Sequence, residues 1–373
     1  MNILIPVLTF GRSGGNRVLS KLADELIQLG HKVDFLCPDG NEDPYFPTLA
    51  GIQWVDSKGN NSKHNNPGSH NKENAFTIQK KLKNALSKIP KANYDVIIAN
   101  HSLTVIPLQR TGWTNKILYY VQAYEPDFYV SIASFKSKIL SQLSAFSYNA
   151  KLFTVVNADI YLKYKKLSAT RTLYPGVDRK IFYPKDKSSI QSANDKIIIG
   201  TVGRMERMKG TQYVLEAFKI LKSKNSNIEL HVAFGIPSDL YEYEGIHCVQ
   251  PHGDEALANY YRTLDYYFCG AFIQLGAFHY PVVEAMSCGV PVITTQYYPS
   301  NDDNAWLCRP GQAADLVTGF ELAQTNPVLK EKKVRQALLD VKQFDWKLVG
   351  EKLNGYLEEL VEISGAANRE RRN

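Results

Sequence analysis

Short apolar runs alternate with longer amphipathic segments along most of this chain, with glycine or proline between them. In the first half, apolar runs at Ile3–Leu8, Lys32–Cys37, Val96–Ala99 and Ile117–Val121 predict buried strands. The amphipathic segment Arg17–Leu29 predicts the helix that follows the first strand. This order of strand, turn, helix and strand predicts a parallel sheet with crossover helices.

The second half repeats the same alternation. Strands are predicted at Lys196–Val202, Ile228–Phe234, Tyr266–Cys269 and Pro291–Thr294. The predicted helices are Gln212–Lys222, Ala256–Thr263, Pro281–Cys288 and Trp346–Ile363. The fold class is therefore α/β, with two doubly wound domains. If these domains face each other, a ligand cleft lies between the carboxyl ends of their strands.

The domain boundaries follow from length and from proline and glycine. A chain of 373 residues is long enough for two domains with separate cores. Proline and glycine interrupt the segments 174–178 and 182–184, and the polar segment Ser188–Asp195 is typical of a connector. We predict an N-terminal domain over residues 1–186 and a C-terminal domain over 187–345. A C-terminal helix and tail over 346–373 could pack back on the N-terminal domain.

Positive charge is concentrated in the first half, where residues 1–186 contain 24 Lys and Arg against 14 Asp and Glu. This charge predicts an anionic partner, which would be a membrane surface, a lipid phosphate or a nucleic acid; alternatively, the lysines only keep a helix face soluble. Nucleic acid is disfavoured because no basic-aromatic readout motif accompanies the lysines. The lysine-rich segment Gln79–Lys91 fits a helix at a membrane interface, and equally an amphipathic core helix.

The rest of the composition points to the cytoplasm. No apolar run is long enough to span a bilayer, and the first residues carry no basic leader. The five cysteines are scattered without a C-x-x-C pair, which fits reduced thiols and offers no metal ligation. We expect a cytoplasmic protein, at the inner face of the membrane if its basic half contacts lipid.

The strongest candidate for chemistry is the segment that follows the first strand of the second half. That strand stops at Gly203, Arg204 and Lys209 follow five positions apart, and Gly210 leads into a helix. Backbone N–H groups and the helix dipole favour a phosphate at such a helix start, and two cations can clamp a diphosphate. Alternatively, both side chains are ordinary solvated charges.

Two further features bear on an anionic or sugar ligand. Gly14 and Gly15 precede the first helix and let the backbone approach a sugar or phosphate, although the same glycines also suit a tight turn without a ligand. Their spacing departs from the G-x-G-x-x-G motif, so the sequence gives only weak support for dinucleotide binding. Glu284, near the start of a predicted helix, either complements the helix dipole or accepts hydrogen bonds from ribose hydroxyls.

Four motifs occur together and in order along nearly the whole chain. They are the Gly14-Gly15 helix start, Tyr174-Pro175-Gly176-Val177-Asp178-x3-Phe182-x-Pro184, Gly203-Arg204-x4-Lys209-Gly210, and Pro281-x-x-Glu284-Ala285-Met286-x-Cys288-Gly289-x-Pro291-Val292-Ile293. This set resembles the retaining GT-B glycosyltransferases of group 1, also called GT4. The resemblance implies two Rossmann-like domains with an interdomain cleft, and a nucleotide-sugar donor held mainly by the second domain.

The resemblance also implies roles for individual residues. Arg204 and Lys209 would be catalytic by neutralising the donor diphosphate, and Glu284 would bind the ribose. Gly14, Gly15 and Gly203 would approach the donor. No cofactor beyond the nucleotide-sugar donor is implied, and no metal, in agreement with the lack of a D-x-D motif.

One departure from the family pattern concerns the transferred sugar. The family carries a glutamate eight residues before Glu284, followed by Gly-Phe-Gly, whereas this chain has Gly276, Ala277, Phe278 and His279. The first three of these are expected to contact the donor. Some members that lack this glutamate resemble rhamnosyltransferases, and the segment 120–129 is similar to one found in that subset, with Ala123 in place of a more usual Asp.

The remaining candidates lie in the first half. His101 follows a predicted strand and is the best candidate for a catalytic polar contact with the donor sugar or acceptor, although a structural role is also open. Gln122, Tyr124 and Glu125 are second choices for acceptor or sugar contact. Tyr124 could stack on acceptor sugars. Glu125 precedes Pro126 and could equally be a turn residue.

Together these features predict an enzyme, a metal-independent hexosyltransferase. It would move a sugar with retention from a nucleotide-diphosphate donor to a saccharide or lipid-linked acceptor in bacterial cell-surface polysaccharide synthesis, for example of lipopolysaccharide. Its partners would be the nucleotide sugar, that acceptor and a membrane surface, with no nucleic acid. The alternatives are a GT-B sugar-nucleotide epimerase or phosphorylase, and a non-catalytic sugar-nucleotide-binding paralogue.

Overall fold

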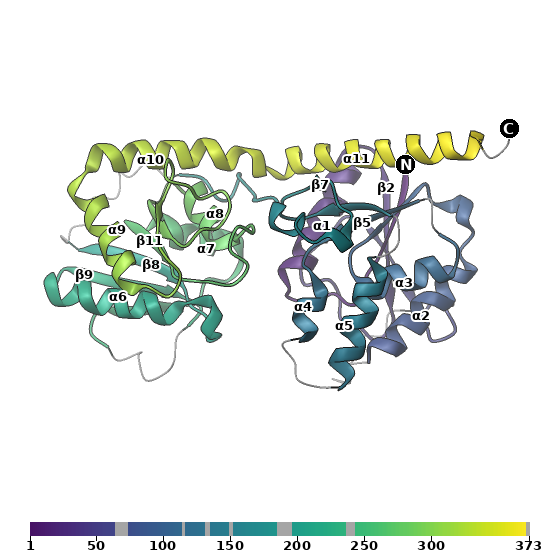
Figure 1. Cartoon of the computed structure of the whole chain (residues 1–373), viewed down its shortest axis with the longest axis horizontal. Coiled ribbons are helices and arrows are strands. Elements are labelled where there is room, and N and C mark those ends of the chain that lie inside the picture. Colours follow the sequence, from purple (N-terminus) through teal and green to yellow (C-terminus); the bar gives the residue numbers. More distant parts are fainter. Residues whose placement is uncertain are drawn as a thin grey trace. The chain divides into compact units, whose positions relative to one another are not determined.

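The computed structural model describes residues 1–63, 74–113, 116–130, 135–148, 152–184, 196–235 and 243–370 (Figure 1). It divides into two compact units. The first consists of Met1–Gly176 together with Trp346–Asn373, and the second of Val177–Asp345. The predicted connector Ser188–Asp195 lies outside the described residues.

The division between the units comes before the predicted boundary at residue 186, because the segment after Gly176 is bonded to the second unit. The Val177 N–H donates to the Phe344 carbonyl oxygen at 2.7 Å. The buried Arg262 guanidinium donates to the Ile181 carbonyl oxygen at 3.1 Å. Both hydrogen bonds lie within the second unit.

The first unit is built on a parallel sheet. Its described strands are β1 (Asn2–Pro6), β2 (Lys32–Pro38), β3 (Gly51–Val55), β4 (Val96–Ala99), β5 (Ile117–Val121), β6 (Phe153–Val156) and β7 (Arg171–Thr172). Their order is β3-β2-β1-β4-β5-β6-β7, and each neighbouring pair is parallel. β4 and β5 are buried at every position, which is why they form continuous apolar runs in the sequence.

Helices connect these strands. They are α1 (Gly14–Gln28), α2 (Ala75–Lys88), α3 (Ser102–Arg110), α4 (Glu125–Val130) and α5 (Phe135–Ser147). Figure 1 shows α2, α3 and α5 as neighbours, and α2 and α5 both pack against α3. The chain leaves β1 toward β2 and β3 and returns on the other side of β1 at β4. The β1/β4 boundary is therefore the topological switch point of this sheet.

The C-terminal helix, α11 (Trp346–Glu370), belongs to the first unit. Gly350 lies so close to α1 that a Cβ there would come within 2.5 Å of the Glu25 Cβ. Arg171 on β7 pairs with Glu359 on α11. The helix runs beyond the predicted end at Ile363, so most of the predicted tail is helical as far as Glu370.

The second unit contains another parallel sheet. Its described strands are β8 (Ile197–Val202), β9 (Ile228–Ala233), β10 (Ile246–Val249), β11 (Tyr266–Cys269), β12 (Val292–Thr294) and β13 (Trp306–Leu307). Their order is β10-β9-β8-β11-β12-β13, again with parallel neighbours. The helices are α6 (Thr211–Lys224), α7 (Gly253–Arg262), α8 (Tyr280–Ser287), α9 (Ala313–Thr325) and α10 (Pro327–Asp340).

One face of the second sheet forms a core with α6 and α9. Leu230 and Phe268 from the strands pack with Phe218 of α6 and Phe320 of α9, and all four are buried. Burial of side chains of this size contributes roughly 1.5–3 kcal/mol each. Alternate residues of β9 face this core, so the residues between them point to the opposite face of the sheet.

The lysine-rich segment predicted at Gln79–Lys91 is a core helix, α2, which ends at Lys88. Leu82 and Leu86 are buried, and the buried Lys81 ammonium pairs with Asp39 at 2.7 Å. The unit's own core therefore covers the apolar face that a membrane-interface helix would need. None of the helices in the described part of the chain combines the length and apolar content needed to cross a bilayer.

Candidate functional site

The candidate site in the second unit lies at the switch point of its sheet. The chain leaves β8 toward β9 and β10 and returns on the other side at β11. The loops after β8 and β11 therefore diverge from one place at the carboxyl edge of the sheet, the usual position for a ligand in such folds. Gly203 begins the loop after β8, and Gly270 begins the loop after β11.

Close backbone contacts explain the two glycines of the Gly203–Gly210 motif. The Gly203 N–H donates to the Ala233 carbonyl oxygen at 2.8 Å, and a Cβ on Gly203 would collide with the Gly235 carbonyl. Gly210 has a φ of 70°, and a Cβ there would collide with the Gly270 carbonyl. Only glycine fits at these two positions. The loop after β8 therefore contacts the loops at Gly235 and Gly270 through backbone atoms.

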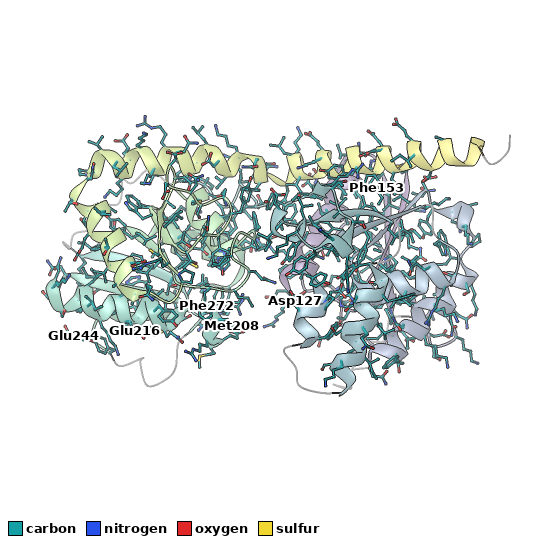
Figure 2. All side chains as sticks on the ribbon, viewed as in Figure 1. Asp127, Phe153, Met208, Glu216, Glu244 and Phe272 are labelled. Atoms are coloured by element: carbon teal, nitrogen blue, oxygen red, sulfur yellow. The ribbon has the colours of Figure 1, made fainter. Side chains whose placement is uncertain are left out.

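Arg204 and Lys209 lie on the loop between these glycines. The Arg204 N–H donates to the Thr211 hydroxyl at 2.9 Å, which ties the loop to the first residue of α6. The loop also holds the loop after β11, because the Phe272 N–H donates to the Met208 carbonyl at 3.1 Å; Figure 2 labels both residues. Two cations thus flank a helix start whose own N–H groups favour an anion.

His279 is close enough to both cations for their charges to lower its pKa, and sequence reasoning did not single it out. It is the N-cap residue of α8, and its ring stacks on Tyr297 with 4.4 Å between the centroids. Burial, together with the charges of Lys209 and Arg204, lowers the pKa of His279 to about 3. The ring is therefore neutral at physiological pH, and the positive charge around it comes from Arg204 and Lys209.

Glu284 is a buried carboxylate on α8, with 2% of the residue exposed. The Tyr261 hydroxyl donates to its Oε2 at 3.1 Å. Burial and the Glu284 charge raise the pKa of Tyr261 well above its ordinary value, so Tyr261 keeps its proton. Glu284 is therefore not a solvated charge, and it lies beyond the first turn of α8, where a carboxylate would complement the helix dipole. Its predicted contact with a ribose stays a prediction.

The segment Gly276–Phe278, where this chain departs from the family pattern, is held by backbone bonds. Gly276 has a φ of 84° and donates its N–H to the Gln296 carbonyl at 2.7 Å. The Phe278 ring meets Phe344 edge-on, with centroids 5.1 Å apart. A glutamate at position 276 would have to adopt the left-handed region that favours glycine. Glycine therefore suits this backbone position better than a glutamate would.

The first unit has a comparable switch point between β1 and β4. Asn100, directly after β4, donates through Nδ2 to the Pro6 carbonyl at the end of β1, at 2.7 Å. The glycine turn follows β1, and α1 begins at Gly14. A Cβ on Gly15 would lie 3.1 Å from the Gln122 amide oxygen, whereas Gly14 faces open space. The structure therefore brings Gly15 and Gln122 together.

His101 and Glu125 also meet, at the start of α3. His101 is the N-cap residue, and its Nδ1 accepts the Leu103 N–H at 3.0 Å and lies 3.4 Å from Glu125 Oε2. Glu125 is buried and accepts the Ser102 N–H at 2.9 Å, as well as a short hydrogen bond from the Ser102 hydroxyl. Glu125 thus fixes the helix start that carries His101. Ser102 is a residue that sequence reasoning missed.

Tyr124 is part of a group of stacked tyrosines. Its ring lies 3.9 Å from that of Tyr164 and 5.6 Å from that of Tyr148, nearly parallel to both. Tyr164 is held in turn by Asp127, which is labelled in Figure 2, through a 2.8 Å hydrogen bond. A sugar that stacks on Tyr124 would have to compete with these rings, so its hydroxyl or ring edge is the better contact.

Comparisons with known proteins agree with this arrangement. Residues 182–338 match the family described as glycosyl transferases group 1. A D-inositol 3-phosphate glycosyltransferase of Arthrobacter sp. (strain FB24) is 25% identical over 195 residues, which cover 46% of this chain and 46% of that protein. The match thus spans about half the length of this curated relative.

Solved structures extend the likeness to nearly the whole chain. Sucrose-phosphate synthase of Thermosynechococcus elongatus has a TM-score of 0.74 at 17% identity, covering 97% of this chain and 100% of that one. Anabaena HepE in complex with UDP-glucose has a TM-score of 0.70 at 14% identity, covering 96% and 100%. At these identities the likeness shows the fold and confirms the predicted pair of Rossmann-like domains. The chain therefore has the GT-B fold, and its residues 182–338 match the family of group 1 glycosyltransferases.

Proposed function

We propose that this protein is a glycosyltransferase that takes its sugar from a nucleotide-diphosphate donor. The observation that carries the proposal is the group of charges at the switch point of the second sheet. Arg204 and Lys209 flank the start of α6, and both lie close enough to His279 to lower its pKa. A diphosphate is the ligand whose negative charge fits two cations and a helix start.

The same group suits the reaction as well as binding. When the bond between sugar and diphosphate breaks, negative charge grows on the leaving diphosphate. Arg204 and Lys209 would stabilise that charge in the transition state, which is where such groups accelerate a reaction. His279 would add a hydrogen-bonding ring without adding charge. Glu284, with Tyr261 as a buried donor to its Oε2, would receive the ribose hydroxyls.

The first unit would supply contacts to the transferred sugar or to the acceptor. The Nδ1 atom of His101 is engaged by the α3 backbone, so a ligand would meet Nε2. Gly15 and Gln122 adjoin one another at the same switch point and would lie beside the donor. In this proposal the departing phosphate takes the acceptor's proton, so that no separate protein base or metal is needed.

Finer features of the proposal rest on the family resemblance. We propose retention at the anomeric carbon and a saccharide or lipid-linked saccharide acceptor in bacterial cell-surface polysaccharide synthesis. A rhamnosyl donor would fit the Gly276 departure. Membrane contact, if it occurs, would use exposed lysines of the first unit such as Lys80 and Lys83, since α2 buries its apolar face.

The test is a panel of nucleotide sugars incubated with the full chain and simple glycoside acceptors, with products identified by mass spectrometry. Transfer with at least one donor is expected, and NMR of the product anomer reports retention. A donor epimer as product would replace the proposal with an epimerase. Phosphate-dependent release of a sugar phosphate would replace it with a phosphorylase. Nucleotide binding without turnover of any donor would indicate a non-catalytic paralogue.

A further inference from the structure

Two histidines and a glutamate gather on β9 and β10, on the opposite face of the sheet from the α6 and α9 core. Glu229 and His231 are two residues apart on β9, so they share one face of the strand. His247 on β10 is the direct partner of His231 in the parallel pairing. The alternate β9 residues Leu230 and Val232 belong to the core on the other face.

The three side chains converge on one small volume. His231 Nε2 lies 3.6 Å from one oxygen of Glu229, and His247 Nε2 lies 3.6 Å from the other. One candidate ligand atom from each residue lies within 4.8 Å of the other two. In a tetrahedral zinc site with bonds of about 2.1 Å, neighbouring ligand atoms are about 3.4 Å apart. Small side-chain rotations would therefore bring the three atoms to coordination distance.

We propose that Glu229, His231 and His247 form a zinc-binding site. Two imidazole nitrogens and a carboxylate are a ligand set that Zn²⁺ accepts, with a fourth position for water. Coordination would join β9 to β10, which is the edge strand of the sheet, through side chains in addition to the backbone. The site would stabilise the second unit.

This site is separate from the proposed donor site. Glu229 and His231 pair in register with Ile198 and Gly200 of β8, whereas Gly203 and the cations follow the end of that strand. Three to five residues of strand correspond to about 10–16 Å. A zinc ion here would take no part in the proposed transfer, so its binding can be tested independently of activity.

Lys196 competes with the metal for the same carboxylate. Its ammonium pairs with the Glu229 oxygen that faces His247, while half of the lysine side chain is exposed. Zinc binding would displace this ammonium into solvent. Loss of the lysine charge should therefore strengthen zinc binding, whereas a network that served only as a charge cluster would lose a stabilising partner.

Isothermal titration of the chelator-treated full chain with ZnCl₂ tests the proposal, with thermal unfolding as a second readout. We expect one zinc ion per chain and a rise in melting temperature. His247→Ala and Glu229→Gln should each weaken zinc binding at least about tenfold, since even outer-sphere partners contribute 10–100-fold. Lys196→Met should bind zinc more tightly than the unaltered chain.

Two controls separate this site from incidental zinc binding. His252→Ala removes an exposed histidine of the same unit outside the cluster, and Cys248→Ser removes the thiol next to His247. Both should bind zinc as the unaltered chain does. The proposal is overturned if the unaltered chain binds no zinc. It is also overturned if His247→Ala and Glu229→Gln bind zinc normally, or if Cys248→Ser abolishes binding.

Discussion

The two sheets each place a histidine at the N-cap of a helix near the switch point, yet the two histidines have opposite surroundings. His101 caps α3 with its own Nδ1 and stands beside the buried Glu125 carboxylate. His279 precedes α8 without a side-chain capping bond and lies near Lys209 and Arg204. One fold thus presents a histidine next to a carboxylate in the first unit and a neutral histidine near two cations in the second.

This difference teaches how one sheet topology can serve two kinds of ligand. The second unit has two cations, Arg204 and Lys209, near its switch point, which suits a diphosphate. The first unit has already paired its carboxylate with the start of α3, so what it offers a ligand is hydrogen bonding and close backbone approach. We therefore expect substitutions in the second unit to affect the leaving group, and substitutions in the first to affect the sugar or the acceptor.

The largest expected effect comes from the cations. Arg204→Ala and Lys209→Ala should each lower kcat by roughly 10²-fold or more, the scale for loss of one donor to transition-state charge. Steady-state kinetics with the donor found in the panel measures this. Arg207→Ala, on the same loop and exposed, is the matched control and should retain activity. Unchanged kinetics in a folded Arg204→Ala/Lys209→Ala double variant would contradict the assignment.

In the first unit, Glu125→Gln should lower kcat/KM by about tenfold. A hydrogen bond to a charged group contributes about 1.5–3 kcal/mol. Weakening the bonds from Ser102 to Glu125 would shift the start of α3 and with it the position of His101. If so, the effects of Glu125→Gln and His101→Ala will not add in a double-mutant cycle. Asp127→Asn, which alters a different contact of α4, is the control. Fully additive losses would show that Glu125 does not act through His101.

The surroundings of His279 predict a dependence of stability on pH. Its pKa is about 3 in the folded chain, whereas an unfolded histidine titrates near 6.5. Between these values the unfolded chain binds more protons, so stability should fall as the pH is lowered from about 6.5 toward 3. One proton corresponds to at most about 1.4 kcal/mol per pH unit. His279→Gln should flatten this slope in urea titrations, and an unchanged slope would contradict a buried neutral ring.

The same histidine can report ligand binding. A diphosphate bound to Lys209 and Arg204 would offset their charges, which are two of the causes that lower the pKa of His279. The ring resonances of His279 in NMR titrations should therefore shift toward a higher pKa when UDP or another nucleoside diphosphate is present. The ring resonances of His101 should not move when the nucleotide is added. A response at His101 alone would move the diphosphate to the first unit.

The accuracy of the sequence-based prediction differs between strands. The buried strands β4, β5 and β11 were predicted with their bounds, because burial on both faces produces continuous apolar runs. Five of the described strands were missed, namely β3, β6, β7, β10 and β13, and for two of them the physical reason is plain. β10 is a half-exposed edge strand, and β13 has two residues, so neither yields an apolar run above the background.

The site shows the same limit. Arg204 and Lys209 were found because the loop that holds them is contiguous in sequence. The contact of Glu125 with Ser102 spans 23 residues, and the pairing of His231 with His247 depends on strand register. Such contacts leave no local pattern. For His279, the one sequence signal was its position directly before the predicted helix that starts near Pro281.

The smallest expected effect concerns the glycine turn of the first unit. A Cβ on Gly15 would lie 3.1 Å from the Gln122 amide oxygen, so Gly15→Ala should push Gln122 by a few tenths of an ångström. Such a displacement costs about 0.5–1.5 kcal/mol, which corresponds to a two- to tenfold rise in the donor KM. Gly11→Ala is the control, because a Cβ there would meet only the Asn16 side chain, at an ordinary 3.7 Å, and should leave the KM unchanged.

A second variant decides why the KM rises. If Gly15→Ala acts only by crowding Gln122, adding Gln122→Ala removes the clash and restores the original KM. If Gln122 itself contacts the donor or acceptor, the double variant stays as weak as Gln122→Ala alone. An unchanged KM in Gly15→Ala, as in Gly11→Ala, would show that the ligand does not reach this turn. The role of the first unit would then rest on His101 and the start of α3.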